Sequence, residues 1–204
     1  PAIDNCGATR TERTLTGFVG WRHLNFAEDL RMRENLTSLL PAPDDGQFSI
    51  EDRFETDNTF NGADIGVMWN GRRGRFTLDV IMRLALGSNH QHVAINGTTS
   101  IRGSSTAGNN FENAPGGLLA QRTNIGSYSR NQFAVVPELG VTLGCPISRQ
   151  WQFTVGYTFL YWGSVVRPGD QIDRDVNPGL LPPASQPLTG LERPVFSFVE
   201  SDLW

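Results

Sequence analysis

A strict alternation of large apolar and smaller or polar side chains runs through residues 151–161. The odd positions are all large and mostly aromatic, and they hold Trp151, Phe153, Val155, Tyr157, Phe159 and Tyr161. A period of two is that of a β-strand, whose successive side chains point to opposite faces. The sequence Arg-Pro-Gly and several acids follow within residues 167–175, so this apolar face ends abruptly in a polar segment.

Other segments show the same alternation. Strands are predicted within residues 13–33, 54–69, 76–101 and 128–145, and a short last strand is expected to start near Val195. The apolar residues change face at Leu30 and Met32, so the first strand is expected to be bulged or divided into two pieces. They change face again after residues 87–89, where a bulge is predicted in the third strand. Helical periodicity fits poorly, and the sequence therefore predicts an all-β fold.

Short and long connections alternate along the chain. Tight turns are predicted at residues 70–74 and 146–149, and long loops at residues 35–47, 102–117 and 167–193. We expect both turns at one end of the sheet and the last two loops at the other. Outer-membrane barrels of bacteria have this arrangement, with short periplasmic turns and long extracellular loops.

Composition limits the class of protein. The 204 residues are 38% hydrophobic and 19% charged, which predicts one folded domain over residues 1–204 and excludes general disorder. The net charge of −4 disfavours nucleic acid as a partner.

Cys6 and Cys145 allow one disulfide at most, and we expect Cys145 to be a free thiol on an apolar strand face. The chain starts without the features of a signal peptide, and its most apolar stretch, residues 150–166, is too short and polar for a spanning helix.

Alternation alone leaves two architectures open. A soluble barrel that binds small molecules would turn the apolar face inward, whereas a transmembrane barrel would turn it outward to lipid. Three features favour the transmembrane barrel: apolar faces free of charge over the about 9–11 residues that a spanning strand needs, aromatic residues near the strand ends, and the alternating connections. The outward residues are then expected to include Leu78, Val80, Leu139, Val141, Val155 and Tyr157.

Three segments support a more specific interpretation. They are "DNTFNGADIG" at residues 57–66, "FAVVPELGVTLG" at 133–144 and "FTVGYTFLYWGSVVRPGDQIDRDVN" at 153–177. They resemble the beta-barrel porin seven family of bacterial outer-membrane proteins. The resemblance implies an antiparallel up-and-down transmembrane β-barrel in the bacterial outer membrane, in contact with its lipid, with no catalytic residue and no cofactor.

The predicted barrel is incomplete in this chain. About six strands are predicted, whereas a single-chain barrel needs at least about eight. Glu200 and Asp202 share a face near the chain end, so that face cannot close a barrel against lipid. We therefore expect residues to be missing at one or both ends, or another copy to complete the barrel, with a neighbouring strand beside residues 195–199.

Motifs for metal chemistry are weak. Asp170, Asp173, Asp175 and Asn177 concentrate oxygen ligands, but the spacing excludes an EF-hand. A solvated turn in which Arg167 and Arg174 pair with the acids is favoured over a calcium site.

His90 and His92 share a face without a third ligand, so a polar loop edge is favoured over a metal site. No arrangement for nucleophilic or acid–base catalysis is present, and the sequence predicts a non-enzymatic protein without a metal.

Charged residues on the polar faces are the candidate functional residues. Asp64, Asp79, Arg83 and Glu138 are expected to point into the lumen. There they would set the ion preference of an open channel, or pair with one another and plug a narrow barrel, which we slightly favour. The alternatives for function are a porin-like barrel for small solutes, a structural barrel that assembles with its own copies or with envelope proteins through long loops, and a soluble binding barrel.

Overall fold

The computed structural model describes residues 11–39, 46–103, 110–148, 150–182 and 190–204. This part of the chain is all-β, with eight strands and two short 3-10 helices. Within it, no helix combines the length and apolarity that a membrane-spanning helix requires.

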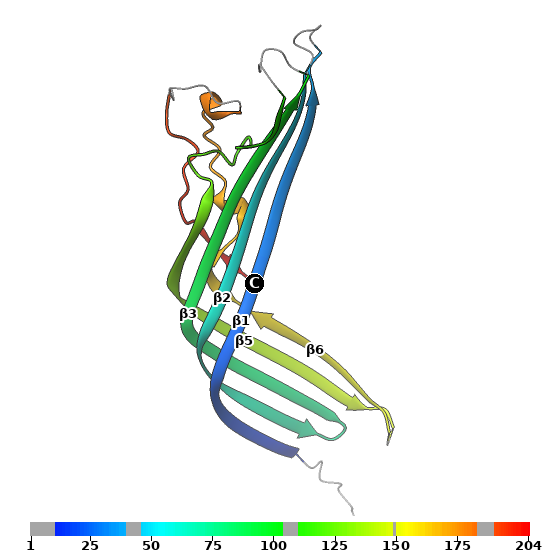
Figure 1. Ribbon diagram of the computed structural model, residues 1–204. Helices are drawn as coiled ribbons and strands as arrows, with labels where there is room; N and C mark the ends of the chain where they lie inside the picture. The colour runs from blue at the N-terminus through cyan, green and yellow to red at the C-terminus, as the bar shows by residue number, and fades with distance from the viewer. Residues whose placement is uncertain (1–10, 40–45, 104–109, 149, 183–189) are drawn as a thin grey trace, which may run out of the picture.

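Five strands form the main sheet, in the order β1-β2-β3-β5-β6, and all pairings are antiparallel. Their bounds are β1 (Thr11–Thr37), β2 (Gln47–Arg73), β3 (Phe76–Arg102), β5 (Gly126–Pro146) and β6 (Gln152–Leu160). The short β4 (Phe111–Pro115) also pairs with β3. Figure 1 shows the long strands as a curved, up-and-down sheet. The predicted fold class is confirmed, and the sheet is not closed within the described residues, where β1 and β6 form its edges.

The two tight connections lie at one end of the sheet, which we call the turn end (Figure 1). The register places the connection between β2 and β3 and the connection between β5 and β6 together there, because Thr77 pairs with Gly144. The opposite end, which we call the loop end, carries the connections that follow β1 and β3. The predicted hairpin order is therefore confirmed for the described residues.

The strands differ in detail from the sequence prediction. β2 continues through Arg73, so the tight turn consists of Gly74 and Arg75 and does not begin at Asn70. Gly74 has a φ of 61°, a left-handed conformation that glycine adopts without a steric penalty. The predicted loop at residues 102–117 contains β4, and Arg149 of the second predicted turn lies outside the described residues.

The predicted bulges are wrong. β1 and β2 keep one register from the pair Thr11–Arg73 to the pair Thr37–Gln47. β2 and β3 keep one register from the pair Gln47–Arg102 to the turn. A strand without a bulge keeps its two faces throughout its length. The apolar residues change face because the surroundings of the sheet change along the strands.

Near the turn end, the apolar side chains lie on the outer face, which no other part of the described chain covers. We call this surface the apolar band, and its most exposed large members are Leu15, Val19, Trp21, Ile65, Phe76, Met82, Phe133, Leu139, Leu143, Phe153, Val155 and Tyr157. Near the loop end, the outer face is polar and carries ion pairs such as Arg53 with Asp29, at 2.8 Å. The band therefore covers only part of each long strand.

Near the loop end, the apolar side chains lie instead on the inner face, under the C-terminal segment, residues 162–204. This segment contains β7 (Trp162–Val166), η1 (Pro168–Gln171), η2 (Pro178–Leu180) and β8 (Glu200–Leu203). In Figure 1 its orange and red ribbon lies beside the long strands on the loop-end side. Two buried clusters join it to the sheet, and their members include Phe54, Phe60, Val93, Ile95, Val136, Trp162, Val165 and Val166.

The end of the chain also corrects the prediction. The last strand is β8, which begins at Glu200 and pairs with β7. Residues 195–199 do not form a strand and have no neighbouring strand in the described part of the chain. Side chains hold this stretch instead: the Val195 N–H donates to Asp173 at 2.9 Å and the Val199 N–H to Gln171 at 3.3 Å.

The substitution Val80→Arg tests the apolar band. Val80 lies on the outer face in the middle of the band segment of β3, where an arginine facing lipid costs about 2–4 kcal/mol of folding free energy. The control is Ala94→Arg, on the same face of β3 but near the loop end. We expect the first variant to be much less stable than the second in lipid vesicles, measured by urea unfolding. Equal stability of the two variants would contradict the assignment of the band to lipid.

Candidate functional site

Four charged side chains meet on the inner face of the sheet, and we call them the charge cluster. Arg22 extends from β1, Asp64 from β2, Arg83 from β3 and Glu138 from β5. Arg83 Nε donates to Asp64 Oδ2 at 3.1 Å, and Arg22 donates to Glu138. Longer ion pairs join Arg22 Nε to Asp64 Oδ2 at 3.9 Å and Arg83 Nη1 to Glu138 Oε2 at 4.0 Å. The cluster has two positive and two negative charges and links four strands.

Glycines leave room for these long side chains. Arg22 pairs across the ladder with Gly62, which in turn pairs with Gly87. A Cβ added to Gly87 would lie 2.2 Å from the Asn61 carbonyl oxygen, and one added to Gly62 would lie 2.4 Å from the Leu86 oxygen. These positions therefore require glycine. A Cβ at Gly62 would also lie 2.7 Å from the Phe60 ring, so this ring occupies the space that a side chain at position 62 would need.

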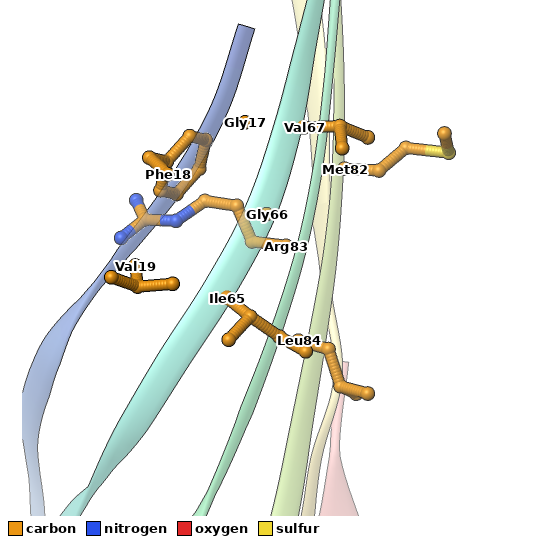
Figure 2. A pocket seen from close by; sticks show the side chains of 9 residues that line it. All are labelled: Gly17, Phe18, Val19, Ile65, Gly66, Val67, Met82, Arg83 and Leu84. Carbon is orange, nitrogen blue, oxygen red and sulfur yellow. The ribbon is translucent and has the colours of Figure 1, made fainter.

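An aromatic ring supports Arg83 from the neighbouring side. Gly66 pairs with Arg83, and a Cβ at Gly66 would lie 2.4 Å from the Phe18 ring, so the ring occupies the space above this glycine. The guanidinium carbon of Arg83 is 5.5 Å from the centre of that ring, a distance that permits a cation–π interaction. Figure 2 shows Phe18 and Arg83 together on one side of the strands, with Val67 and Met82 pointing away from them.

The cluster is buried to different degrees. Asp64 is 2% exposed and Arg22 is 7% exposed, whereas Arg83 and Glu138 are half-buried. Two buried atoms, Arg22 Nη1 and Asp64 Oδ1, have no hydrogen-bond partner among the described residues. A buried polar atom without a partner is costly, so these two atoms offset part of the stabilisation that the ion pairs of the cluster provide.

The structure brings together three of the four residues predicted from the sequence. Asp64, Arg83 and Glu138 join the charge cluster, whereas Asp79 lies nearer the turn end and accepts a hydrogen bond from Asn70 at 2.8 Å. Arg22 was missed although it directly follows Trp21, and the alternation already implied that it lies on the face opposite Trp21. A regular register would have placed Arg22 and Asp64 on one face, since both stand at even positions of paired strands.

Amide side chains connect the inner face to β7. Asn58 both donates to the Val166 carbonyl oxygen, at 2.9 Å, and accepts from the Val166 N–H, at 2.8 Å. Asn89 and Gln91 each donate to the Ser164 carbonyl oxygen at 2.7 Å. All three amide side chains are fully buried. They satisfy backbone groups of β7 that would otherwise be buried without partners, and they fix β7 against β2 and β3.

Carboxylates anchor other parts of the loop end. Asp52 accepts three backbone N–H groups, those of residues 118–120, at 2.7–3.1 Å. Asp173 accepts from the backbone of Val195 and Asp175, and it pairs with Arg193 at 2.8 Å. The N–H of Val195 contributes most to lowering the pKa of Asp173, with further contributions from Asp175 and Arg193, and partial burial opposes them.

Side chains of the weak metal motifs form contacts with other groups of the protein. Arg167 pairs with Glu28 at 2.9 Å and is attracted more weakly by Asp170, so its main partner lies outside the predicted acidic turn. Asn177 accepts from the Gly179 N–H at 2.9 Å. His90 and His92 lie beside Asn131 and Ser127, at 2.9 and 2.8 Å. Across the described ranges, no group of three or more His, Cys, Asp or Glu side chains is arranged to hold a metal ion.

Comparison with known families identifies the chain. A family model described as "Putative beta barrel porin-7 (BBP7)" matches residues 1–204, the whole chain. The chain belongs to the BBP7 family. The resemblance found in the sequence is therefore confirmed, and the antiparallel sheet agrees with the β-barrel in the family description. Comparisons with curated proteins and with solved structures gave no match.

The substitution Asp64→Asn tests the charge cluster of this BBP7 chain. Removing one partner of a buried ion pair leaves an uncompensated charge and costs about 3–5 kcal/mol. Asp29→Asn is the matched control, because Asp29 pairs with Arg53 on the exposed outer face. We expect a large loss of unfolding free energy for Asp64→Asn and little change for the control. If denaturant titrations gave similar losses for both, the cluster would not stabilise the fold.

Acid is expected to loosen residues 195–199. The lowered pKa means that the carboxylate of Asp173 stabilises the folded state at pH values above its ordinary pKa of 3.8. This contribution is lost as the pH falls through the lowered value, because the protonated group accepts hydrogen bonds more weakly. Hydrogen exchange of the Val195 amide, corrected for its intrinsic rate, should therefore accelerate in acid. Asp173→Asn should remove most of this pH dependence, and Asp170→Asn should retain it.

Proposed function

We propose that the protein is a porin-like barrel of the bacterial outer membrane that passes small polar solutes along its inner face. The observation that carries the proposal is the position of the charge cluster. Arg83 and Glu138 stand on the segments of β3 and β5 whose opposite face carries the apolar band. Charged groups at the depth of a bilayer core face the protein interior or water, so the inner face is expected to line a lumen there.

Strand length supports this placement. A tilted strand needs about 9–11 residues to cross a bilayer, whereas β1, β2 and β3 have 27 residues each. The band segment of β3 runs from Phe76 to Leu86, which satisfies that requirement. Beyond the band, the outer faces of β1 and β2 carry ion pairs, as expected for strands that extend from the membrane into water. The loop end would then lie outside the cell and the turn end in the periplasm.

The charge cluster would narrow the lumen and influence which ions pass. Rings of charged side chains set ion preference in channels. The cluster contains no net charge, so it would discriminate weakly between cations and anions. Arg83 and Glu138, which remain partly exposed, are the members of the cluster that a passing solute would contact.

A closed, structural barrel is the second candidate function. It is favoured by the C-terminal segment, whose Trp162, Val165 and Val166 are almost completely buried against the inner face near the loop end. Such packing occupies part of the interior. In this case, the protein would assemble with envelope proteins or with its own copies through the loop end, and it would conduct no solute. Neither candidate involves catalysis.

Conductance across planar bilayers distinguishes the two candidates. We expect the full-length protein, inserted in its folded form, to produce discrete current steps. Glu138→Gln leaves one excess positive charge in the cluster and should shift the selectivity toward anions. The control Glu112→Gln, at an exposed position near the loop end, should leave the selectivity unchanged. Folded protein that inserts without current steps would contradict the porin-like function and support the structural one.

A further inference from the structure

Four arginines gather at the turn end. Arg13 lies on β1, Arg72 and Arg73 end β2, and Arg75 belongs to the turn, and all four are exposed. None of them forms an ion pair with an acidic side chain in the part of the chain that the structure describes. Glu12 also lies at this end, opposite Arg72, so the four arginines leave the end positive, whereas the protein as a whole has a net charge of −4.

Two of these arginines adjoin the apolar band. Arg13 and Arg73 stand on the outer face with Trp69 and Phe76, whereas Arg72 points to the other face. Arg13 pairs with Gly71, and Arg73 is two residues beyond Gly71, so the two arginines are diagonal neighbours. Diagonal neighbours lie about 7–8 Å apart. Two flexible guanidinium groups at this separation can reach one phosphate between them.

Aromatic and aliphatic side chains complete the site. A hollow of about 210 Å³ lies on the outer face, lined by Arg13, Arg73, Trp69, Phe76, Leu78 and Leu143. A Cβ at Gly71 would be 2.4 Å from the indole of Trp69, so this ring lies over the glycine. The indole thus lies between the arginines and the apolar band. Aromatic rings favour this level, where the headgroups of a bilayer meet its hydrocarbon core.

We propose that this hollow binds the headgroup of an anionic phospholipid in the leaflet at the turn end. The inference rests on the proposed membrane placement. Arg13 and Arg73 hold the phosphate through charge-assisted hydrogen bonds, since guanidinium groups match phosphate oxygens in geometry. Trp69 and Phe76 flank the glycerol region, and the acyl chains follow Leu78 and Leu143 along the band. The continuous apolar wall fits a lipid better than a free phosphate, which would gain nothing from it.

Lipid selectivity of the full-length protein tests the proposal. The protein is inserted into phosphatidylcholine vesicles that contain a minor fraction of phosphatidylglycerol, and the lipids retained after gentle extraction are quantified. We expect enrichment of phosphatidylglycerol over its bulk fraction. Arg13→Gln/Arg73→Gln should reduce this enrichment at least about fivefold, since one arginine near a charged lipid surface supplies roughly that factor. The control Arg33→Gln/Arg102→Gln removes the same charge at the loop end and should retain the enrichment.

Each other outcome overturns a defined part of the proposal. Equal loss in both double variants would mean that overall charge attracts the lipid and that the hollow is not a site. Displacement of phosphatidylglycerol by inorganic phosphate at constant ionic strength would mean that the arginines bind phosphate without the apolar wall. Inserted wild-type protein without enrichment would overturn the lipid site alone. A chain that fails to insert and fold in vesicles would overturn the proposed function together with this inference.

Discussion

The hydrogen-bonded ladder between β1, β2 and β3 is the constraint on which the rest of the structure depends. It runs without interruption over 27 residues of each strand. A ladder without a bulge cannot exchange its faces, so every side chain is assigned to one face by its position alone. The apolar residues nevertheless change face part-way along. The same strands therefore present an exposed apolar outer face near the turn end and a packed inner face near the loop end.

On the inner face, glycines and paired charges lie behind the apolar band. Gly62 and Gly87 approach so closely that no other residue fits, and Gly62 pairs with Arg22 across the ladder. Charges that would be costly on the apolar side are paired on the opposite side, Arg83 with Asp64 and Arg22 with Glu138. Because each pair joins different strands, the cluster links β1, β2, β3 and β5 to one another, at the same position along the strands as the apolar band. The same groups give a porin-like interior its polar character under the proposed function.

The C-terminal segment is held on the face of the main sheet by side chains, and it adds no strand to the edge of that sheet. Asn58 offers β7 a donor and an acceptor from the face of the sheet, much as a neighbouring backbone would from its edge. Within the C-terminal segment itself, Gln171 both donates to and accepts from the backbone of Val199, and Asp173 accepts from the Val195 N–H. Side-chain groups thus satisfy the buried backbone, and Trp162 and Val165 supply apolar contact. The interior near the loop end is consequently occupied by the chain itself, which is the main argument for the structural alternative.

The local sequence pattern was sufficient to predict much of the fold of this protein. Alternation in residues 76–86 and 133–144 determined the strands and their two faces, because the direction of a side chain depends only on its parity within a strand. The short connections predicted at residues 70–74 and 146–149 determined the antiparallel order. It also determined that Asp64, Arg83 and Glu138 share the face opposite the apolar one. Only the tertiary structure decided that the faces continue without a bulge, because a change of apolar face in sequence is equally consistent with a bulge and with a change of surroundings. It alone brought Arg22 to Glu138 and Val166 to Asn58, partners 116 and 108 residues apart, since contacts at such separation depend on register and chain path rather than on local pattern.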